Sequence, residues 1–259
     1  MSAATATAPA VRTPSATRAV LRAELRLFRR EPGALFWIMA FPTLLLTVLG
    51  CIPYFREPAA SLGRLRPIDV YVPVSVLLAM VMAGLQAMPP VLTGYRERGI
   101  LRRMSTTPVR PGALLSAQMG LHGAAALVSA LLALTVGRLA FDVPLPGQPG
   151  GYVLALALSI VAALSLGALV SALCRTAKAA NSAGAAMFFP MMFSAGLWLP
   201  VRSMPDVLAR IVESLPFGAA AQALTEAGAG DWPDWRYLGV LALWTAVLTG
   251  AATRWFRWE

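Results

Sequence analysis

The sequence is poor in charge and in the side chains that soluble enzymes use for chemistry. Only 13% of its 259 residues are charged and 58% are hydrophobic, whereas a soluble domain carries about 25% charged residues. It contains one histidine, His122, one lysine, Lys178, and two cysteines, Cys51 and Cys174. This scarcity of charge excludes an ordinary soluble domain and indicates a chain that lies mostly within a membrane.

The missing residue types also exclude most catalytic and metal sites. His122 has no second ligand nearby, so we predict no metal site and no catalytic residue; at membrane depth it is either functional or hydrogen-bonded across a helix interface. No Asp or Glu falls inside the long apolar runs, which disfavours a proton-driven carrier. Lys178 is not preceded by the glycine-rich segment of a phosphate-binding loop. We therefore predict no cofactor on this chain; if the protein uses ATP, another polypeptide binds the nucleotide and its Mg²⁺.

The net charge of +10 comes mainly from arginines in the segments between the apolar runs. Because no basic domain exists outside those runs, we expect membrane lipids and an intracellular partner rather than nucleic acid to face this charge. Cys51 and Cys174 lie near the ends of different runs, at opposite faces of the membrane in the topology below, so we expect no disulfide between them.

Six apolar runs predict the architecture. About 20 residues are needed to cross the hydrocarbon core of a bilayer, and the last run is bracketed by Trp235 and Trp255 like an aromatic belt. The predicted fold class is therefore an all-α integral membrane protein, with one six-span transmembrane domain over 32–257. The predicted spans are 33–53, 70–94, 111–136, 151–174, 181–199 and 236–255.

The region before the first span divides into two parts. Residues 1–16 are mainly Ala, Thr, Ser and Pro and predict a disordered cytosolic tail. Residues 17–31 predict an amphipathic elbow helix in the inner headgroup layer, with Leu21, Leu25 and Phe28 opposite the arginines. A plain solvated charge stripe is the alternative. The arginines expected at the membrane surface are Arg18, Arg22, Arg26, Arg29 and Arg30.

The distribution of charge predicts the orientation. With the N-terminus inside, 15 of the 22 Lys and Arg residues fall on inner segments and eight of the 12 acidic residues fall on outer ones. The positive-inside rule then places both termini in the cytosol. We expect a multi-pass protein of the bacterial cell (inner) membrane. The first outer loop, with Arg56, Arg64 and Arg66, is discordant.

The segment 201–234, between the last two predicted spans, is neither hydrophilic nor long enough for two spans. Pro205-Asp206 indicates a helix start, and Pro216 separates a second short apolar stretch. We predict an outer re-entrant helical pair, which is tolerated at membrane depth only where other helices bury it. A pair lying on the surface is the alternative.

The segment 95–110 carries five arginines and one glutamate between two apolar runs. Arg at the bilayer centre costs about 2.5 to 3.5 kcal/mol on the mildest scale, so this segment must be an aqueous loop. We predict that any energy source inside the cell acts on this coupling loop.

Methionine, aromatic and amide side chains of the second and fifth predicted spans are candidates for a substrate path. Such side chains form adaptable surfaces for varied apolar ligands, although ordinary packing is the alternative. The candidates are Met80, Gln86, Asn181, Phe188, Phe189, Met192 and Phe193.

Two sequence patterns resemble those of a known family. Residues 96–109 are similar to a Glu-x-x-Gly-(Thr)-Leu-x-x-Leu-x-x-(Thr)-Pro signature, with Ile100 and Met104 as departures. Residues 194–200 and the later Pro205 and Pro216 resemble an outer Gly-x-x-x-Pro … Leu-Pro … Pro pattern. Together with six spans behind an elbow, they resemble the membrane permease subunit of type-two ABC exporters, the drug and antibiotic efflux permeases.

This resemblance implies that a separate nucleotide-binding subunit docks under the coupling loop and the elbow. It also implies a dimer, with a second copy of the permease and a path formed mainly by the second and fifth spans, and an outer gate near Pro200, Pro205 and Pro216. The residues implied in coupling are Arg96, Glu97, Arg98, Gly99, Ile100, Leu101, Arg102, Arg103, Met104 and Pro108.

The sequence therefore favours a permease subunit, not itself an enzyme, of an ATP-driven exporter of an apolar or amphipathic small molecule such as a drug or antibiotic. Within the same class, the alternative is the permease of a lipid-linked glycan exporter. From another class, the alternative is a membrane scaffold or immunity protein that transports nothing.

Overall fold

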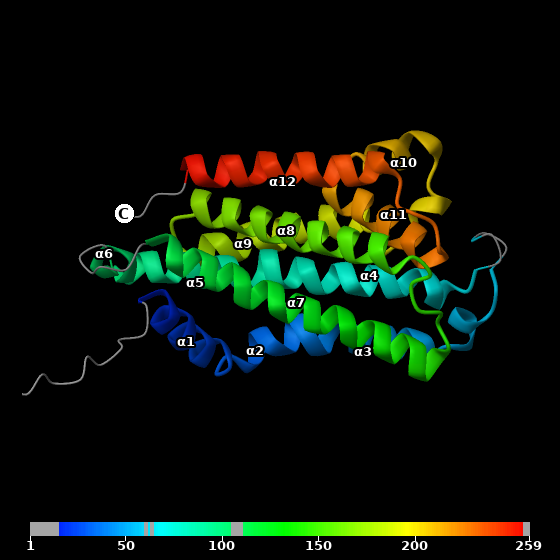
Figure 1. The fold of residues 1–259 in the computed structure, drawn as a ribbon, viewed down its shortest axis with the longest axis horizontal. Coiled ribbons are helices and arrows are strands. Elements are labelled where there is room, and N and C mark those ends of the chain that lie inside the picture. Colours follow the sequence, from blue (N-terminus) through cyan, green and yellow to red (C-terminus); the bar gives the residue numbers. More distant parts are fainter. Residues whose placement is uncertain (1–15, 60–61, 63–64, 105–110, 256–259) are drawn as a thin grey trace, which may run out of the picture.

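The computed structural model describes residues 16–59, 62, 65–104 and 111–255, and the regular elements in these ranges are all helical. The long helices run side by side along one axis (Figure 1). Most of the predicted tail 1–16 and residues 105–110 of the predicted loop lie outside the described residues. The elements are α1 (Ala16–Phe28), α2 (Pro32–Leu35), η1 (Phe36–Ala40), α3 (Phe41–Cys51), η2 (Pro53–Arg56), α4 (Pro67–Val81), η4 (Met82–Ala87), α5 (Met88–Glu97), α6 (Ile100–Met104), α7 (Pro111–Phe141), α8 (Pro149–Leu173), α9 (Ala177–Ser194), η5 (Val201–Ser203), α10 (Asp206–Glu213), α11 (Pro216–Ala229) and α12 (Trp235–Trp255).

Five helical stretches are long and apolar enough to cross a membrane, and a sixth results if the bent pair α10–α11 counts as one span. This confirms the all-α membrane fold. We call Pro32–Cys51 the first span and Pro67–Glu97 the second span; the other three are Gly112–Phe141, Pro149–Leu173 and Trp235–Trp255. The predicted fifth span corresponds to α9, which is not among the five, because Lys178, Asn181 and Ser182 make its first turns polar.

Several helices end at positions other than those predicted. The second span continues to Glu97, so the first residues assigned to the coupling loop are helical. Helix α7 runs to Phe141, past Arg138, whose long side chain is exposed near the helix end. Helix α9 ends at Ser194 rather than at 199, because the chain turns at Gly196, whose φ is +86°.

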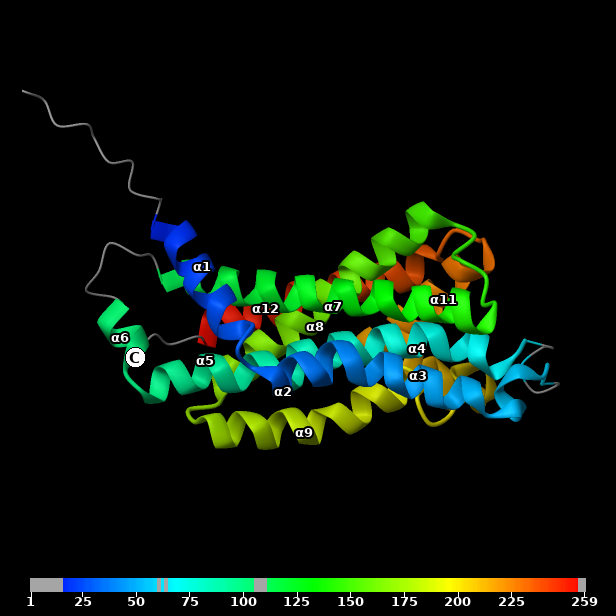
Figure 2. The ribbon, with the colours of Figure 1, turned by 90° about the horizontal axis from the view of Figure 1, so that it is seen from below.

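The second span forms the centre of the bundle. In its most apolar 18-residue window, 78% of the residues are buried, against 22% for the first span and for α12. Its core side chains, including Leu77, Leu78, Met80 and Leu85, are fully buried. Figure 2 shows α9 along one edge of the bundle, with the second span beside it. Helices α3, α7, α8, α9 and α11 all pack against this central span.

Two π-helical segments interrupt the first two spans, and each lies just before proline. Segment η1 precedes Pro42, and η4 precedes Pro89-Pro90. Proline has no N–H group, and its ring collides with the carbonyl four residues earlier. Those carbonyls belong to Ile38, Leu85 and Gln86, which all lie within the π segments, so the widened turns relieve the collisions.

Pro89 and Pro90 also leave backbone carbonyls of η4 without a donor from their own helix. The carbonyl of Leu85 would accept from residue 89 or 90, and both are proline. That of Gly84 would accept from residue 88 or 89, but the N–H of Met88 donates to Ala83.

Glycines of the neighbouring helices approach these two carbonyls closely. A methyl group added at Gly167 of α8 would collide with the carbonyl oxygen of Gly84, and one added at Gly184 of α9 would collide with that of Leu85. Gly84 itself lies against the backbone of Ala163 in α8. The second span is therefore held between α8 and α9 by contacts that admit no side chain.

The bent pair lies at the other end of the bundle from α1 and α6 (Figure 1). Helices α10 and α11 meet at 97°. Helix α11 is packed against α4, α8 and α12, and its Phe217, Ala219, Ala220, Ala223 and Leu224 are almost fully buried. On α10, by contrast, Val207 and Ile211 are exposed. Burial of α11 by its neighbours favours the re-entrant arrangement over a pair lying wholly on the surface.

We expect Gly167→Ala to destabilise the protein, because the added methyl group meets a backbone carbonyl that cannot rotate away. Overpacking of this kind costs about 1 to 3 kcal/mol. The midpoint of thermal unfolding of the purified protein in detergent should fall. The matched control is Gly250→Ala on α12, where a methyl group meets no atom within 4 Å, and its midpoint should not fall. Equal midpoints for the two variants would contradict the packing described above.

Candidate functional site

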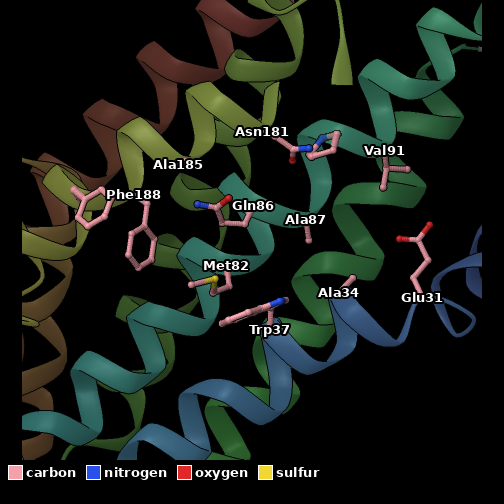
Figure 3. Close-up of a pocket in the computed structure, with 12 residues that line it drawn as sticks. Glu31, Ala34, Trp37, Met82, Gln86, Ala87, Val91, Asn181, Ala185 and Phe188 are labelled. Carbon is pink, nitrogen blue, oxygen red and sulfur yellow. The ribbon is translucent and has the colours of Figure 1, made fainter. Parts of the chain in front are cut away.

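A cavity of about 520 Å³ lies between the first span, the second span and α9. Its size is within the usual range for sites that bind small molecules, about 300 to 1,000 Å³. Figure 3 shows side chains from all three helical stretches around it. The lining residues are mostly apolar: Glu31, Ala34, Trp37, Met82, Gln86, Ala87, Pro90, Val91, Asn181, Ala185, Phe188 and Phe189.

Helical periodicity explains why these side chains converge. On α9, Asn181, Ala185 and Phe188 are spaced by four and three residues and so share one face. Ahead of and within the first span, Glu31, Ala34 and Trp37 are each three residues apart. The second span contributes residues of its π segment and Pro90, which follows it, so the irregular turn forms part of the cavity wall. Such π segments are frequent at functional sites.

Four of the seven predicted path residues line this cavity, namely Gln86, Asn181, Phe188 and Phe189. The other three lie elsewhere. Met80 and Met192 are fully buried in the main core, and Phe193 packs beside Val201 in a small cluster next to the bent pair α10–α11. The structure thus brings the amides and two phenylalanines together and assigns Met80 and Met192 to packing.

The predicted coupling segment begins as the end of α5, turns, and continues as α6. Gly99 has a φ of +66°, a backbone conformation that suits glycine, and the turn folds α6 back so that Leu101 is buried with Tyr95 and Leu114. Glu97 is exposed at the helix end. Arg98, Arg102 and Arg103 are also exposed, and Ile100 is half-buried. The side chain of Met104 and all of Pro108 lie outside the described residues.

Arg96 has a different environment from the other arginines of this segment. Its Nη1 donates to the carbonyl of Ser171 at 2.9 Å and to that of Cys174 at 2.8 Å, at the C-terminal end of α8. A cation at this end of a helix satisfies carbonyls that have no intrahelical partner. Arg96 therefore joins α5 to α8, and its role in docking a partner stays a prediction.

A buried carboxylate fastens the elbow helix to the bundle. Glu24 of α1 is only 7% exposed, and its Oε2 accepts hydrogen bonds from Tyr95 Oη of α5 (2.8 Å) and Gln118 Nε2 of α7 (2.6 Å). Burial raises the pKa of Glu24, while the hydrogen bonds from Tyr95 and Gln118 lower it by a smaller amount. The elbow thus contacts two other elements through one titratable group.

His122 lies one turn further along α7 from Gln118. Its Nδ1 is 2.9 Å from the carbonyl of Gln118, in its own helix, and its ring meets that of Phe28 edge-on with centroids 5.1 Å apart. His122 is therefore part of the contact between α7 and the elbow.

The remaining predicted site residues lie at the two ends of the bundle. The five elbow arginines are exposed, as are Leu21 and Leu25 of the stripe predicted opposite them. At the other end, Pro200 precedes η5, Pro205 precedes α10, and Pro216 begins α11 and is buried. Their roles at the membrane surface and in gating stay predictions.

Glu24, Glu31 and Trp37 are the residues that sequence reasoning missed. Glu24 lies four residues from both Val20 and Phe28, which also face the bundle. Helical spacing therefore predicts this buried face, provided that a charged residue is accepted on it. In the sequence, Glu31 is only the last residue of the predicted elbow, and Trp37 is only part of the first predicted span. Neither has a local signal that points to a cavity.

These helices and this cavity define a class: a multi-pass α-helical membrane protein with a cavity between its helices. Within that class, the chain belongs to the ABC-2 family transporter proteins, whose sequence pattern matches residues 63–254. The match confirms the resemblance to type-two ABC permeases.

Two curated relatives support this assignment. The chain is 27% identical over 185 residues to the inner membrane transport permease YhhJ of Escherichia coli (strain K12), and equally to the protein of that name from Shigella flexneri. The alignments cover 69% of this chain and 48% of each relative, so the chain spans about half the length of the curated relatives it matches.

We expect docking of the elbow to weaken as the pH rises. Because its pKa is raised in the docked state, Glu24 binds its proton more tightly there, so docking is favoured at low pH and loses stability above the ordinary pKa of a glutamate, about 4.3. Glu24→Gln should remove this dependence. The measurement is the mobility of a nitroxide at Arg22→Cys, in a chain with Cys51 and Cys174 replaced by Ala.

The control is Glu57→Gln, which changes an exposed carboxylate beyond η2. It should keep the pH dependence of the unmodified chain. A nitroxide whose mobility is the same at every pH in the unmodified chain would show that Glu24 does not control elbow docking.

Proposed function

We propose that this chain is the permease subunit of an ATP-driven exporter and that it transports an apolar or amphipathic small molecule. The observation that carries the proposal is the cavity of about 520 Å³ between the first two spans and α9 in a member of the ABC-2 family. Nine of its twelve lining residues have apolar side chains. An apolar wall of this kind suits drug-like or antibiotic-like molecules rather than the polar sugar of a lipid-linked glycan.

The partner is a separate nucleotide-binding subunit, which holds ATP and Mg²⁺ and docks on the end of the bundle formed by α1 and the α5–α6 turn. Helices α1 and α6 lie together at that end (Figure 1). Exposed arginines of both elements, and Glu97, supply charge for such a contact. Fixed contacts at Tyr95–Glu24 and Arg96–Ser171 connect the docking surface to α1 and α8.

The arginine-rich end is the cytosolic end, and the protein lies in the bacterial inner membrane with both termini in the cytosol. Most of the exposed arginines of the described chain lie at this end, in α1 and at the α5–α6 turn, and fewer lie at the opposite end. This asymmetry follows the positive-inside rule. The exposed elbow arginines contact anionic lipid headgroups.

Two copies of the chain form the transport path. Helix α9 lies at an edge of the bundle (Figure 2) and exposes Asn181 and Ser182, together with Phe189, which is 62% exposed. Polar side chains facing hydrocarbon are costly, whereas a second copy would cover them and close the cavity. The dimer therefore buries the side of α9 that a single chain leaves open.

Co-purification tests the proposal. The affinity-tagged chain, gently solubilised from the membranes of its own host, should carry an ATP-hydrolysing subunit with it. Glu97→Ala should keep that subunit but lower ATP-driven efflux about tenfold, since losing a charge-assisted hydrogen bond costs about 1.5 kcal/mol or more. Arg96 is left unchanged, because its replacement would also release the end of α8.

The matched control is Glu57→Ala, which removes an exposed carboxylate at the other end of the first span. It should support normal efflux. Unchanged efflux with Glu97→Ala would reject the coupling role of Glu97. If no ATPase accompanies the unmodified chain, the permease proposal fails and a scaffold or immunity protein becomes the better assignment.

A further inference from the structure

The cavity between the first span, the second span and α9 is polar at one end and aromatic at the other. The first span starts at the end of the bundle that carries α1, and Glu31 precedes Trp37 by six residues, about 9 Å at the helical rise of 1.5 Å per residue. Helix α9 starts at the same end, and Asn181 precedes Phe188 by about 10 Å. Both helices therefore present a polar group first and an aromatic ring deeper in the bundle.

The second span runs in the opposite direction and shows the same order of polar and apolar residues along the cavity. Its Met82 is at the aromatic end, and Gln86 lies one turn nearer the polar end. In the view of Figure 3, Glu31 and Phe188 are on opposite sides of the cavity, with Gln86 between them. An occupant that satisfies the whole cavity has a polar head and an apolar body.

Glu31 gives the polar end its charge. It is the one charged residue among the twelve that line the cavity. The neighbouring Arg29 and Arg30 line a separate groove along the elbow with Arg26. The cavity wall therefore carries a negative charge that no lining cation balances.

Among the described residues, the structure shows no hydrogen bond or ion pair of the Glu31 carboxylate. It stands at the N-cap of α2 but makes no capping hydrogen bond with its side chain. The ion pairs found among the described residues join Arg66 to Asp69 and Arg236 to Asp234, far from the cavity lining. The carboxylate is thus available at the mouth of the cavity, where it is exposed.

The aromatic end adds a second preference for positive charge. Trp37, Phe188 and Phe189 line it together with Met82, which provides polarizable, adaptable contacts. Aromatic rings, tryptophan most of all, attract cations through their faces as well as binding apolar groups. An anionic amphiphile would meet the Glu31 charge without a counter-charge from the cavity wall.

We propose that this cavity binds amphipathic organic cations, with an amine or quaternary ammonium head at Glu31 and Asn181 and an aromatic or aliphatic body between Trp37 and Phe188. This inference rests on the proposed function, because it names the substrate class of the same site. It narrows an apolar or amphipathic small molecule to one that carries a positive charge at one end.

The test compares two probes of the same shape. One is the 6-phenylhexyl-trimethylammonium ion, and the other is its neutral isostere, in which carbon replaces the quaternary nitrogen. Both are radiolabelled, and binding to the full chain in lipid nanodiscs is measured by equilibrium dialysis, with empty nanodiscs subtracted. The cation should bind the unmodified chain more tightly than the isostere.

Glu31→Gln should weaken binding of the cation about fivefold, the upper range for an exposed charge pair, and leave the isostere unchanged. Gln keeps the size of the side chain, and the position is exposed, so folding should be unaffected. The matched control Glu57→Gln removes a carboxylate outside the cavity lining and should change neither affinity. Trp37→Leu should weaken both probes.

Three results would overturn the inference: no binding of the cation, equal affinities for cation and isostere in the unmodified chain, or a preference for the cation that survives Glu31→Gln. The assay contains neither ATP nor a partner subunit, so it reports on the cavity alone. A failure here leaves the permease proposal to the co-purification experiment, and a missing ATPase there leaves the binding result intact.

Discussion

The packing of the bundle around the second span depends on two backbone N–H groups that are missing, those of Pro89 and Pro90. Pro89 and Pro90 cannot donate to the preceding turn, so the second span widens into a π segment and leaves carbonyls of Gly84 and Leu85 without helical partners. Gly167 and Gly184 let α8 and α9 approach those carbonyls. The same irregular turn carries Met82 and Gln86 into the cavity wall. One local defect thus sets both the closest packing and the lining of the site.

A second constraint operates where the bundle meets the elbow. Glu24, Tyr95 and Gln118 come from α1, α5 and α7, and their hydrogen bonds join three elements that are distant in sequence. Arg96 adds a fourth element by binding the end of α8. The carboxylate of Glu24 and the guanidinium of Arg96 both lose contact with water in these positions. Each gains hydrogen bonds of fixed geometry in return. Polar contacts among four elements therefore hold together the end of the bundle that carries most of the exposed arginines.

Much of the fold was predictable from the sequence, because apolar runs of 20 residues or more have few other structures available to them. The bent pair was also readable, from Pro205 and Pro216 and the short apolar stretches beside them. Helix ends were less so. Arg96 was expected in the aqueous loop, but its guanidinium is satisfied by carbonyls of α8, a contact between residues 75 positions apart. Helix α9 was predicted as a span from its apolar second half, but the polar residues of its first turns keep it from being one of the five apolar stretches long enough to cross a membrane.

The site divides in the same way. Gln86, Asn181, Phe188 and Phe189 were found from residue type alone, and they line one cavity. Met80 has the same chemistry as Met82 but lies two residues away, on another side of the helix and within the core. Residue type does not tell the core face of the second span from its cavity face. The helices that pack against each face decide which methionine lines the cavity. Glu31 and Trp37 belong to the site because the first span crosses the second beside α9, and only the packing of the three helices reveals that crossing.

The order in which a ribosome makes this chain bears on the bent pair α10–α11. Helix α11 has 14 residues, includes Gln222 and Glu226, and is buried between α4, α8 and α12. Helix α12 is synthesised after it, and hydrogen bonds join the two regions: the indole Nε1 of Trp244 donates to the carbonyl of Ser214, and the carboxylate of Glu226 accepts from the N–H of Asp234. Helix α11 therefore cannot reach its final packing while it is being made. The end of the bundle that carries α10 and α11 is therefore completed only after α12 has been synthesised and has packed against α8 and α11.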